Sequence, residues 1–449
     1  MPFIPNSSLK EEMLKEIGLK DIDELFSDIP EEIRIKDLNL PEGSTEEEVV
    51  KKLREISKKN KPFPDLLSFL GGGIKPHYVP SAVKHILMRS EFYTSYTPYQ
   101  PEASQGILQA MFEYQSIISE LTGMDIANCS LYDMSTSLGE AVRMCMRINR
   151  KKRILVPRNI SWERKSVLKN YIAGLDAETV EVDYDRESGR MDISDLERKI
   201  DNETCCLYVE NPNYFGIFEE DVEEISEIVH GRGALLIVGV DLLSLALVRP
   251  PGDYNADIAI SEGRTYGTGM NMGGSSLGIF ACRKEFLRNM PGRIIGLTHD
   301  VDGNRAFCMT LQTREQHIRR EKATSNICTN ESLNALATQV YLSLLGSRGF
   351  VELAKRNLEN ARKLYERLTS LPWFKPVFSG SYFNEFVLRS SQDVYYMNKE
   401  LLKRDIIAGL PLEKYFPELE RCMLFGITEI YSEEDIERLV RAIKEVYHV

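Results

Sequence analysis

Long hydrophobic runs and targeting signals are missing from the sequence. The longest apolar stretch, residues 234–248, has 15 residues and contains Asp241, whereas a membrane-spanning helix needs roughly 20. The N-terminus has neither the basic start nor the apolar core of a secretory signal. These absences predict a cytoplasmic protein with no membrane partner, in which residues 234–248 form a buried strand and its exit loop.

Cysteine pairs and clusters of metal ligands are also missing. Eight cysteines are scattered along the 449 residues without a C-x-x-C pair, and no histidine stands at ligand spacing to them. A disulfide framework or a zinc or other metal site is therefore not expected. A net charge of −12 also excludes a general electrostatic grip on nucleic acid or on an anionic membrane.

Strand-like and helix-like segments alternate from about residue 104 onward, in a chain long enough for two or three domains. Short apolar runs occur at residues 153–156, 204–209, 234–240, 257–260 and 277–281, and helical stretches at 161–173, 193–200 and 219–230 separate the earlier ones. This order predicts an α/β fold with a mostly parallel sheet covered by helices on both faces. Ligands of such sheets bind at the carboxyl ends of the strands.

Both ends of the chain differ from this central part. The N-terminal segment is polar and helical, and Ser44 with Glu47 resembles a capping box that opens a helix over residues 46–58. We expect this arm to lie on the main body or on a partner. The last helix is predicted to be capped by Ser432 and Asp435. The predicted division is a helical arm (1–62), a large α/β domain (63–328) and a small α+β domain (329–449).

Lysine is absent from residues 242–283, and the next lysine is Lys284. The gap follows Asp241, which ends an apolar strand, and it includes the exit of the next strand at residues 261–267. In enzymes of the aspartate-aminotransferase fold that use pyridoxal phosphate (PLP), an aspartate at the first position keeps the pyridinium nitrogen protonated, and a lysine at the second forms the Schiff base. Asp241 alone is weak evidence, because a strand-end aspartate is more often a helix cap or a loop anchor.

No nearby side chain supplies the missing amine. Arg264 cannot replace a lysine, since a guanidinium stays protonated and is not a usable nucleophile. Lys284 stands between Arg283 and Glu285, and these charged neighbours predict a solvated surface lysine. A PLP-type scaffold without its lysine implies that another chain completes the chemistry.

Two long segments resemble the signatures of one known family. Residues 92–106 and the 21 residues 310–330 are similar to signatures of glycine decarboxylase, the P-protein of the glycine cleavage system. Shorter matches occur at residues 69–73, 77–80, 127–133, 211–216 and 250–257. Some members of this family are single long chains, and others are split into two subunits. This chain resembles the N-terminal-half subunit, called subunit 1 or α.

The resemblance implies a fold, a reaction and partners. The fold is that of PLP-dependent transferases of fold type I. The PLP lysine belongs to the homologous partner, glycine decarboxylase subunit 2, and the active site forms where the two subunits meet. There glycine loses carbon dioxide, and its aminomethyl group passes to the lipoyl arm of H-protein. Two alternatives stay open: a scaffold or regulatory subunit that does not touch substrate, and an autonomous PLP enzyme that uses Lys284 or another lysine. An αβ and an α2β2 assembly are both compatible with the sequence.

Candidate site residues lie mainly in the two long signatures. Residues 93–100 contain three tyrosines and three other hydroxyl side chains, which can stack on a ring, donate to a carboxylate or form an interface. We expect contacts to substrate or cofactor at the interface from Tyr93, Thr94, Tyr96, Tyr99, Thr324 and Ser325. Weaker candidates are Arg314, His317 and His77. The plain alternatives are a rigid interface loop without substrate contact and a helix with a solvated basic face and structural ion pairs.

Departures from the family pattern gather around the expected cofactor pocket. They affect residues 133–141, 159–164 and 240–246, whereas the two long signatures are intact. A pocket that binds no PLP is free to drift. We therefore expect no catalytic residue on this chain alone.

Overall fold

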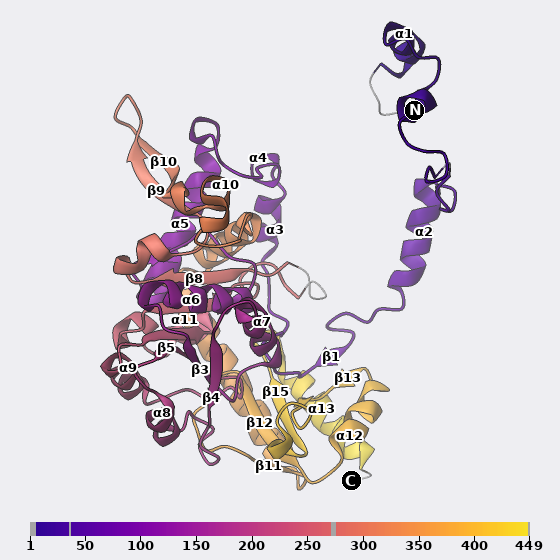
Figure 1. Cartoon of the computed structure of the whole chain (residues 1–449). Coiled ribbons are helices and arrows are strands. Elements are labelled where there is room, and N and C mark those ends of the chain that lie inside the picture. Colours follow the sequence, from indigo (N-terminus) through magenta and orange to yellow (C-terminus); the bar gives the residue numbers. More distant parts are fainter. Residues whose placement is uncertain (1–5, 36, 271–274, 448–449) are drawn as a thin grey trace. The chain divides into compact units, whose positions relative to one another are not determined.

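The computed structural model of the chain describes residues 6–35, 37–270 and 275–447. Contacts divide the chain into two units, Met1–Lys61 and Pro62–Val449 (Figure 1). We refer to the first unit as the arm. No helix among the described residues is both long and apolar enough to cross a membrane.

The arm consists of short helices joined by turns and irregular segments. They are η1 (Ser7–Leu9), α1 (Lys10–Glu16), η2 (Ile22–Phe26) and α2 (Glu46–Ser57). The capping box of α2 is formed by Thr45 and Glu48, so the prediction of Ser44 and Glu47 is wrong by one residue. Thr45 directly precedes the first helical residue, and its hydroxyl accepts from the Glu48 backbone N–H at 3.3 Å. Ser44 stands two residues before the first helical residue and cannot take this position.

Large apolar side chains of the arm are turned to solvent. On α2, Val49, Leu53 and Ile56 are all exposed. Their spacing of four and three residues places them on one face of the helix, the pattern of a helix that packs against another surface. The arm therefore carries an apolar stripe that the rest of this unit does not cover.

A parallel-rich sheet forms the centre of the second unit. It has seven strands in the order β2-β8-β7-β6-β5-β3-β4. Their bounds are β2 (Ile126–Ala127), β8 (Gly278–Cys282), β7 (Ile258–Glu262), β6 (Leu235–Val240), β5 (Thr204–Asn211), β3 (Arg153–Pro157) and β4 (Glu178–Val182). Strands β3 to β7 run parallel, and β8 lies antiparallel between β7 and β2. The predicted mostly parallel sheet and its five predicted strands are confirmed.

Helices cover both faces of this sheet. The helices are α5 (Gln105–Thr122), α8 (Ile193–Lys199) and α9 (Val222–Gly231) on one face, and α6 (Met134–Asn149) and α7 (Trp162–Ile172) on the other. Along β3, Leu155 packs in the first core, whereas Ile154 and Val156 pack in the second. This alternation follows from the two-residue period of a strand that is buried on both sides.

The C-terminal part forms a second layer with its own core. Its elements are the strands β11 (Phe374–Pro376), β12 (Glu385–Ser390), β15 (Cys422–Gly426) and β14 (Leu410–Pro411), in that order, with α12 (Val394–Leu402) and α13 (Glu433–Val446). Ser432 and Asp435 form the predicted capping box of α13. Ile436, Leu439 and Ile443 lie on one stripe of this helix and are buried in the C-terminal core.

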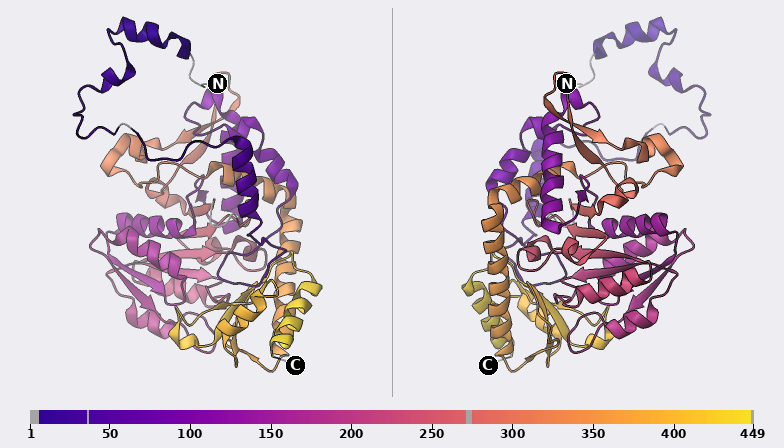
Figure 2. Two further views of the ribbon diagram at one scale, coloured as in Figure 1. Left: turned by 90° about the vertical axis from the view of Figure 1, so that its right-hand side faces the viewer. Right: turned by 90° about the vertical axis from the view of Figure 1, so that its left-hand side faces the viewer.

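The long helix α11 (Ser332–Thr369) links the two layers. Gly346 interrupts it with a non-helical φ of 60° and ψ of 177°. Before this kink Tyr341 packs in the core of the large sheet, and after it Leu364 and Leu368 pack in the C-terminal core. Figure 2 shows this orange helix running along the body toward the C-terminal layer. The two predicted domains therefore form one contact unit.

Residues at the start of the predicted large domain also belong to the C-terminal layer. Strand β1 (Leu67–Ser68) pairs in parallel with β13 (Ile406–Ile407). Leu67 and Phe69 are buried in the C-terminal core. The chain thus packs against the small layer before it enters the large sheet.

A hairpin and short helical segments complete the second unit. The hairpin pairs β9 (Ile294–His299) with β10 (Arg305–Thr310) and projects from the body beside α10 (Figure 1). The short segments are α3 (Ser81–Leu87), α4 (Ser90–Tyr93), α10 (Gln316–Arg319), η3 (Pro101–Ala103), η4 (Leu242–Ala246), η5 (Pro251–Tyr254), η7 (Lys284–Asn289), η8 (Gln312–Arg314), η9 (Arg320–Lys322) and η10 (Pro417–Leu419). The first signature is fixed to the hairpin, because the Gln105 side chain exchanges two hydrogen bonds with the Phe307 backbone at 2.8 and 2.9 Å.

Candidate functional site

A cavity of about 260 Å³ opens at the carboxyl ends of the central strands. Its walls come from the ends of β5, β6 and β7, from the N-termini of α6 and α7, and from residues 72–77 and 384–385. Ligands of parallel α/β sheets bind at this position. The side chains in the cavity decide whether it suits PLP.

Asp241 ends β6 and holds the loop that follows. Its Oδ1 accepts from the Leu243 backbone N–H at 3.0 Å and from the Tyr266 hydroxyl at 2.8 Å. The Tyr266 oxygen in turn accepts from the Leu243 N–H at 2.8 Å. These are the contacts of a loop anchor, which was one of the two interpretations of its position in the sequence.

Carboxylates of the chain itself occupy the N-terminus of α6. Glu262, at the end of β7, accepts from the backbone N–H groups of Met134 at 3.3 Å, Arg264 at 3.0 Å and Leu277 at 3.1 Å. Asp133 caps the helix by accepting from the Thr136 N–H at 2.7 Å. Burial raises the pKa of Glu262, and the backbone hydrogen bonds oppose that rise. A helix N-terminus is the natural place for a cofactor phosphate, and here the N–H groups of Met134 and Thr136 already donate to carboxylates of the chain.

Ion pairs take up other parts of the cavity. Arg164 Nη1 lies 3.3 Å from Glu210 Oε1, and the Tyr208 hydroxyl donates to the same oxygen at 2.9 Å. Among the described residues that line the cavity, Lys75 is the only lysine. Its amine is 3.0 Å from Glu385 Oε1 and its side chain is 6% exposed.

The residues of the cavity therefore do not fit PLP. Asp241 Oδ1 accepts from the loop that follows β6, Glu262 accepts from the Met134 N–H at the N-terminus of α6, and the exit of β7 offers Arg264 where a lysine is needed. Lys284 is exposed at the start of η7 and does not line the cavity, as its neighbours predicted. Across residues 6–35, 37–270 and 275–447, no group of three or more acidic, histidine or cysteine side chains is arranged to hold a metal ion.

The predicted interface loop, residues 93–100, presents its tyrosines to solvent. Tyr96 is 75% exposed, and Tyr93 and Tyr99 are exposed as well. Thr94 is also exposed, but its hydroxyl donates to the Ser90 carbonyl at 2.6 Å and so fixes the last turn of α4. None of these side chains is among the described residues that line the strand-end cavity. The loop therefore offers its rings outside the cavity of its own chain.

The second signature, residues 310–330, is a folded loop with short helical turns. Arg320 has a φ of 53°, a left-handed backbone that a continuous helix does not allow, so the alternative of one continuous basic helix is wrong. Arg314 donates to the carbonyls of Leu311 at 3.2 Å, Gly292 at 3.0 Å and Met290. Its donors thus serve the chain itself, and its role toward an anion stays a prediction.

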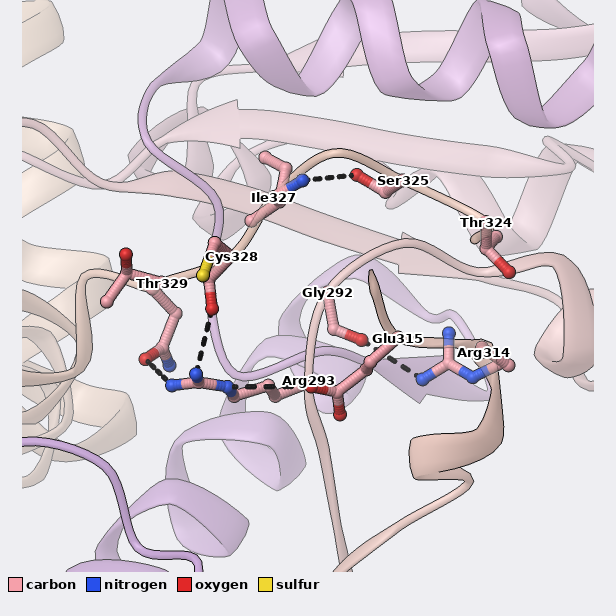
Figure 3. Close-up of a pocket in the computed structure, with 10 residues that line it drawn as sticks. Gly292, Arg293, Arg314, Glu315, Thr324, Ser325, Ile327, Cys328 and Thr329 are labelled. Atoms are coloured by element: carbon pink, nitrogen blue, oxygen red, sulfur yellow. Dashed lines mark hydrogen bonds and ion pairs between the residues drawn. The ribbon is translucent and has the colours of Figure 1, made fainter. Parts of the chain in front are cut away.

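Thr324 and Ser325 line a small cavity together with Arg293 and Arg314 (Figure 3). A volume of about 10 Å³ holds about one water molecule, so glycine does not fit inside it. The Ser325 hydroxyl accepts from the Ile327 N–H at 3.0 Å, and the Thr324 N–H donates to the Arg314 carbonyl at 3.0 Å. These contacts fix the shape of the segment, and contact with a substrate across an interface stays a prediction.

Arg293, a residue that the sequence did not single out, reaches this same segment. Its Nη2 donates to the Cys328 carbonyl at 2.8 Å (Figure 3), and its Nη1 donates to Asn330 Oδ1 at 3.1 Å. The available signal was its place directly before the apolar residues Ile294 and Ile295, where a charged side chain needs buried partners.

His77 lines the strand-end cavity, but its ring belongs to a buried ion pair. Nδ1 lies 2.9 Å from Glu429 Oε2, and the two side chains are 6% and 5% exposed. Glu429 also accepts from the Tyr78 N–H at 2.8 Å and from Asn357 Nδ2 at 3.0 Å. Burial raises the pKa of Glu429, but the hydrogen bond and charge of His77, together with backbone hydrogen bonds, outweigh burial and hold that pKa at about 2.

Known proteins of similar sequence include members of one family. The family model described as glycine cleavage system P-protein matches residues 2–443. The chain is 48% identical over 433 residues to the "Probable glycine dehydrogenase (decarboxylating) subunit 1" of Carboxydothermus hydrogenoformans, with 96% of each chain covered. It is 48% identical over 446 residues to a protein of the same name from Thermococcus kodakarensis, with 99% of this chain and 98% of that relative covered.

Solved structures agree with the fold. A crystal structure of glycine decarboxylase (P-protein) of the glycine cleavage system, in inhibitor-bound form, matches with a TM-score of 0.92 at 39% identity and covers 99% of this chain and 100% of that chain. A sphingosine-1-phosphate lyase of Burkholderia pseudomallei matches with a TM-score of 0.68 at 14% identity, over 93% of this chain and 94% of that chain, which shows the fold alone. The predicted fold class, an α/β fold of PLP-dependent type, is confirmed.

Proposed function

The chain belongs to the family of the glycine cleavage system P-protein, and we propose that it works as subunit 1 of a two-subunit glycine dehydrogenase (decarboxylating). With subunit 2 it decarboxylates glycine in the cytoplasm and passes the aminomethyl group to the lipoyl arm of H-protein. The names of the relatives support the assignment as subunit 1. H-protein, glycine and the partner are inferred from the family resemblance.

One observation carries this proposal: the signature loop lies outside the cavity of its own chain, and that cavity does not suit the cofactor. Tyr96 and its neighbours do not line the strand-end cavity, while Glu262 accepts from an N–H at the N-terminus of α6 and Arg264 stands at the exit of β7, where a lysine is needed. A chain built in this way contributes to an active site on another chain. We therefore place the PLP and its lysine on subunit 2, and no PLP lysine on this subunit.

The residues of this chain would shape the shared site and orient glycine. Tyr93 and Tyr96 are exposed, so their hydroxyls can donate hydrogen bonds to the glycine carboxylate and their rings can exclude water. Thr324 and Ser325 would support the site from the second signature. Exclusion of water strengthens each polar contact to the substrate carboxylate, because the local dielectric constant falls.

Glycine–bicarbonate exchange with H-protein tests the proposal. The assay is run on this chain, on subunit 2 and on the reconstituted complex. Exchange that requires both subunits is the expected result. Exchange by this chain alone would overturn the division of labour, and a folded complex without exchange would overturn the function.

Tyr96→Phe separates this proposal from a scaffold that does not touch substrate. We expect the variant complex to lose about tenfold or more in exchange rate, because one substrate hydrogen bond is worth roughly 1.5–3 kcal/mol when it reaches a charged group. Tyr396→Phe is the matched control, since Tyr396 is an exposed tyrosine on α12. Equal turnover of both variants and the wild-type complex would favour the scaffold.

A further inference from the structure

Arg293 contacts the interface loop as well as the second signature. Besides its bonds to Cys328 and Asn330, Nη1 donates to Thr97 Oγ1 at 3.4 Å and Nη2 to the Tyr99 hydroxyl at 3.5 Å. Acceptors from two segments, far apart in the sequence, therefore meet on one guanidinium. The side chain is 7% exposed, so these contacts are made inside the protein.

Only an arginine can hold this arrangement. A guanidinium is planar and directs five N–H donors at fixed angles, whereas a lysine offers three donors from one point. Glu315 Oε2 forms an ion pair with Nε at 3.9 Å, beyond hydrogen-bond distance, so the hydrogen bonds of the guanidinium go to acceptors on the two segments. A buried charge without such partners is costly. The two segments are thus held at a fixed mutual distance.

The ring of Tyr99 is held between two groups of this chain. The Arg293 guanidinium carbon is 5.6 Å from the ring centroid, within the roughly 6 Å range of a cation–π contact. The His317 ring packs edge-on against Tyr99 at 5.7 Å and 72°. Tyr99 is nevertheless 49% exposed. One part of the ring is fixed, and the other part is open to a partner.

We propose that Arg293 is a positioning residue, which sets the 93–100 loop against residues 324–330 before subunit 2 binds. It presents Tyr99 and Thr97 in one geometry, so that the shared glycine site forms without a further search of loop conformations. This inference rests on the proposed function, because the shared glycine site that Tyr99 would contact forms only with subunit 2.

Kinetics of reconstituted complexes that carry Arg293→Met test the inference. The fraction of assembled complex is first measured by light scattering. The kcat per assembled complex and the KM for glycine are then determined. We expect kcat to fall about ten- to hundredfold, since misplacement by about 1 Å can cost that much. Arg293→Lys should restore assembly but recover kcat only in part. Arg288→Met, a change of an exposed arginine in η7, should leave both constants unchanged.

A residue that is merely structural would lower the assembled fraction and leave kcat per complex at the wild-type value, and this result would overturn the inference. If Arg293→Met does not fold, Arg293→Lys and Tyr99→Leu carry the same test: each must lower kcat, and the double variant must lose less than the product of the two effects. Wild-type kcat in either single variant would refute the positioning role.

A readout without activity separates this inference from the proposed function. Cys328 is an exposed cysteine, and its backbone carbonyl accepts a hydrogen bond from Arg293. Its alkylation in the isolated chain should be severalfold faster in Arg293→Lys than in wild type or Arg288→Met. A wild-type complex without exchange would refute the proposed function alone, whereas an unchanged alkylation rate would refute the link through Arg293.

Discussion

Glu429→Gln should destabilise the chain strongly, because it removes one partner from a buried ion pair. The pair joins His77 Nδ1 to Glu429 Oε2 at 2.9 Å with little exposure of either side chain. Glutamine keeps the carbon skeleton and can still accept from the Tyr78 N–H, so the substitution mainly removes the charge. Loss of one partner from a buried pair costs roughly 3–5 kcal/mol.

The pKa of Glu429 gives the same magnitude by another route. Burial raises this pKa, whereas the contacts with His77 and backbone hydrogen bonds lower it by more. The resulting pKa is about 2, against an ordinary value of 4.5. A carboxyl group with a depressed pKa stabilises the folded state above its ordinary pKa, and this contribution is lost as the pH falls toward the folded value. The gap corresponds to about 3 kcal/mol at neutral pH.

Urea denaturation of the isolated chain checks both statements. The free energy of unfolding is measured at pH 7 and in steps down to about pH 3, with Glu434→Gln as control because Glu434 forms an exposed pair with Arg441. Glu429→Gln should be about 3 kcal/mol less stable at pH 7, and the difference should shrink below about pH 4.5. A difference that does not change with pH, or no difference at all, would refute the role given to this pair.

Three further predictions concern other parts of the chain. Leu53→Glu on the exposed stripe of α2 should leave the stability of the isolated chain within about 0.5 kcal/mol but weaken assembly with subunit 2 in light scattering; unchanged assembly would remove the arm from the interface. Cys328 should be the fast-reacting thiol of the isolated chain, since most other cysteines are buried, and subunit 2 should protect it from alkylation; equal rates in the complex would place it outside the interface. Gly216→Ala should cost about 2 kcal/mol or more in urea denaturation, because its Cβ would lie 2.1 Å from the Glu385 carbonyl oxygen at a φ of +82°. Gly303→Ala, at a φ of +80° without neighbours within 4 Å, reports the backbone strain alone, and equal losses would contradict the clash.

Local patterns made most of the fold predictable. Residues 234–240 are apolar throughout and became β6, and Ser432 with Asp435 opened α13 as expected. The start of α2 was misplaced because Ser44 and Thr45 are both capping residues, and three glutamates follow them. The extended backbone of Thr45, with a φ of −68° and a ψ of 156°, decides between them, and the sequence does not specify it.

The candidate site was predictable only in part, because its contacts join distant segments. The composition of residues 93–100 indicated an exposed, tyrosine-rich loop, and its tyrosines are exposed. Arg293 meets Thr97 across 196 positions of sequence, and Glu262 meets the start of α6 across 128 positions. Neither residue has a local pattern that reveals such partners.

The position of the PLP lysine tests the central claim most directly. The active complex is reduced with borohydride, which fixes the cofactor to the lysine that holds it, and the labelled peptide is identified by mass spectrometry. We predict that the label lies on subunit 2 and that this chain stays unlabelled, in the wild type and in Lys75→Ala alike. A label on Lys75, Lys284 or any other lysine of this chain would contradict the account.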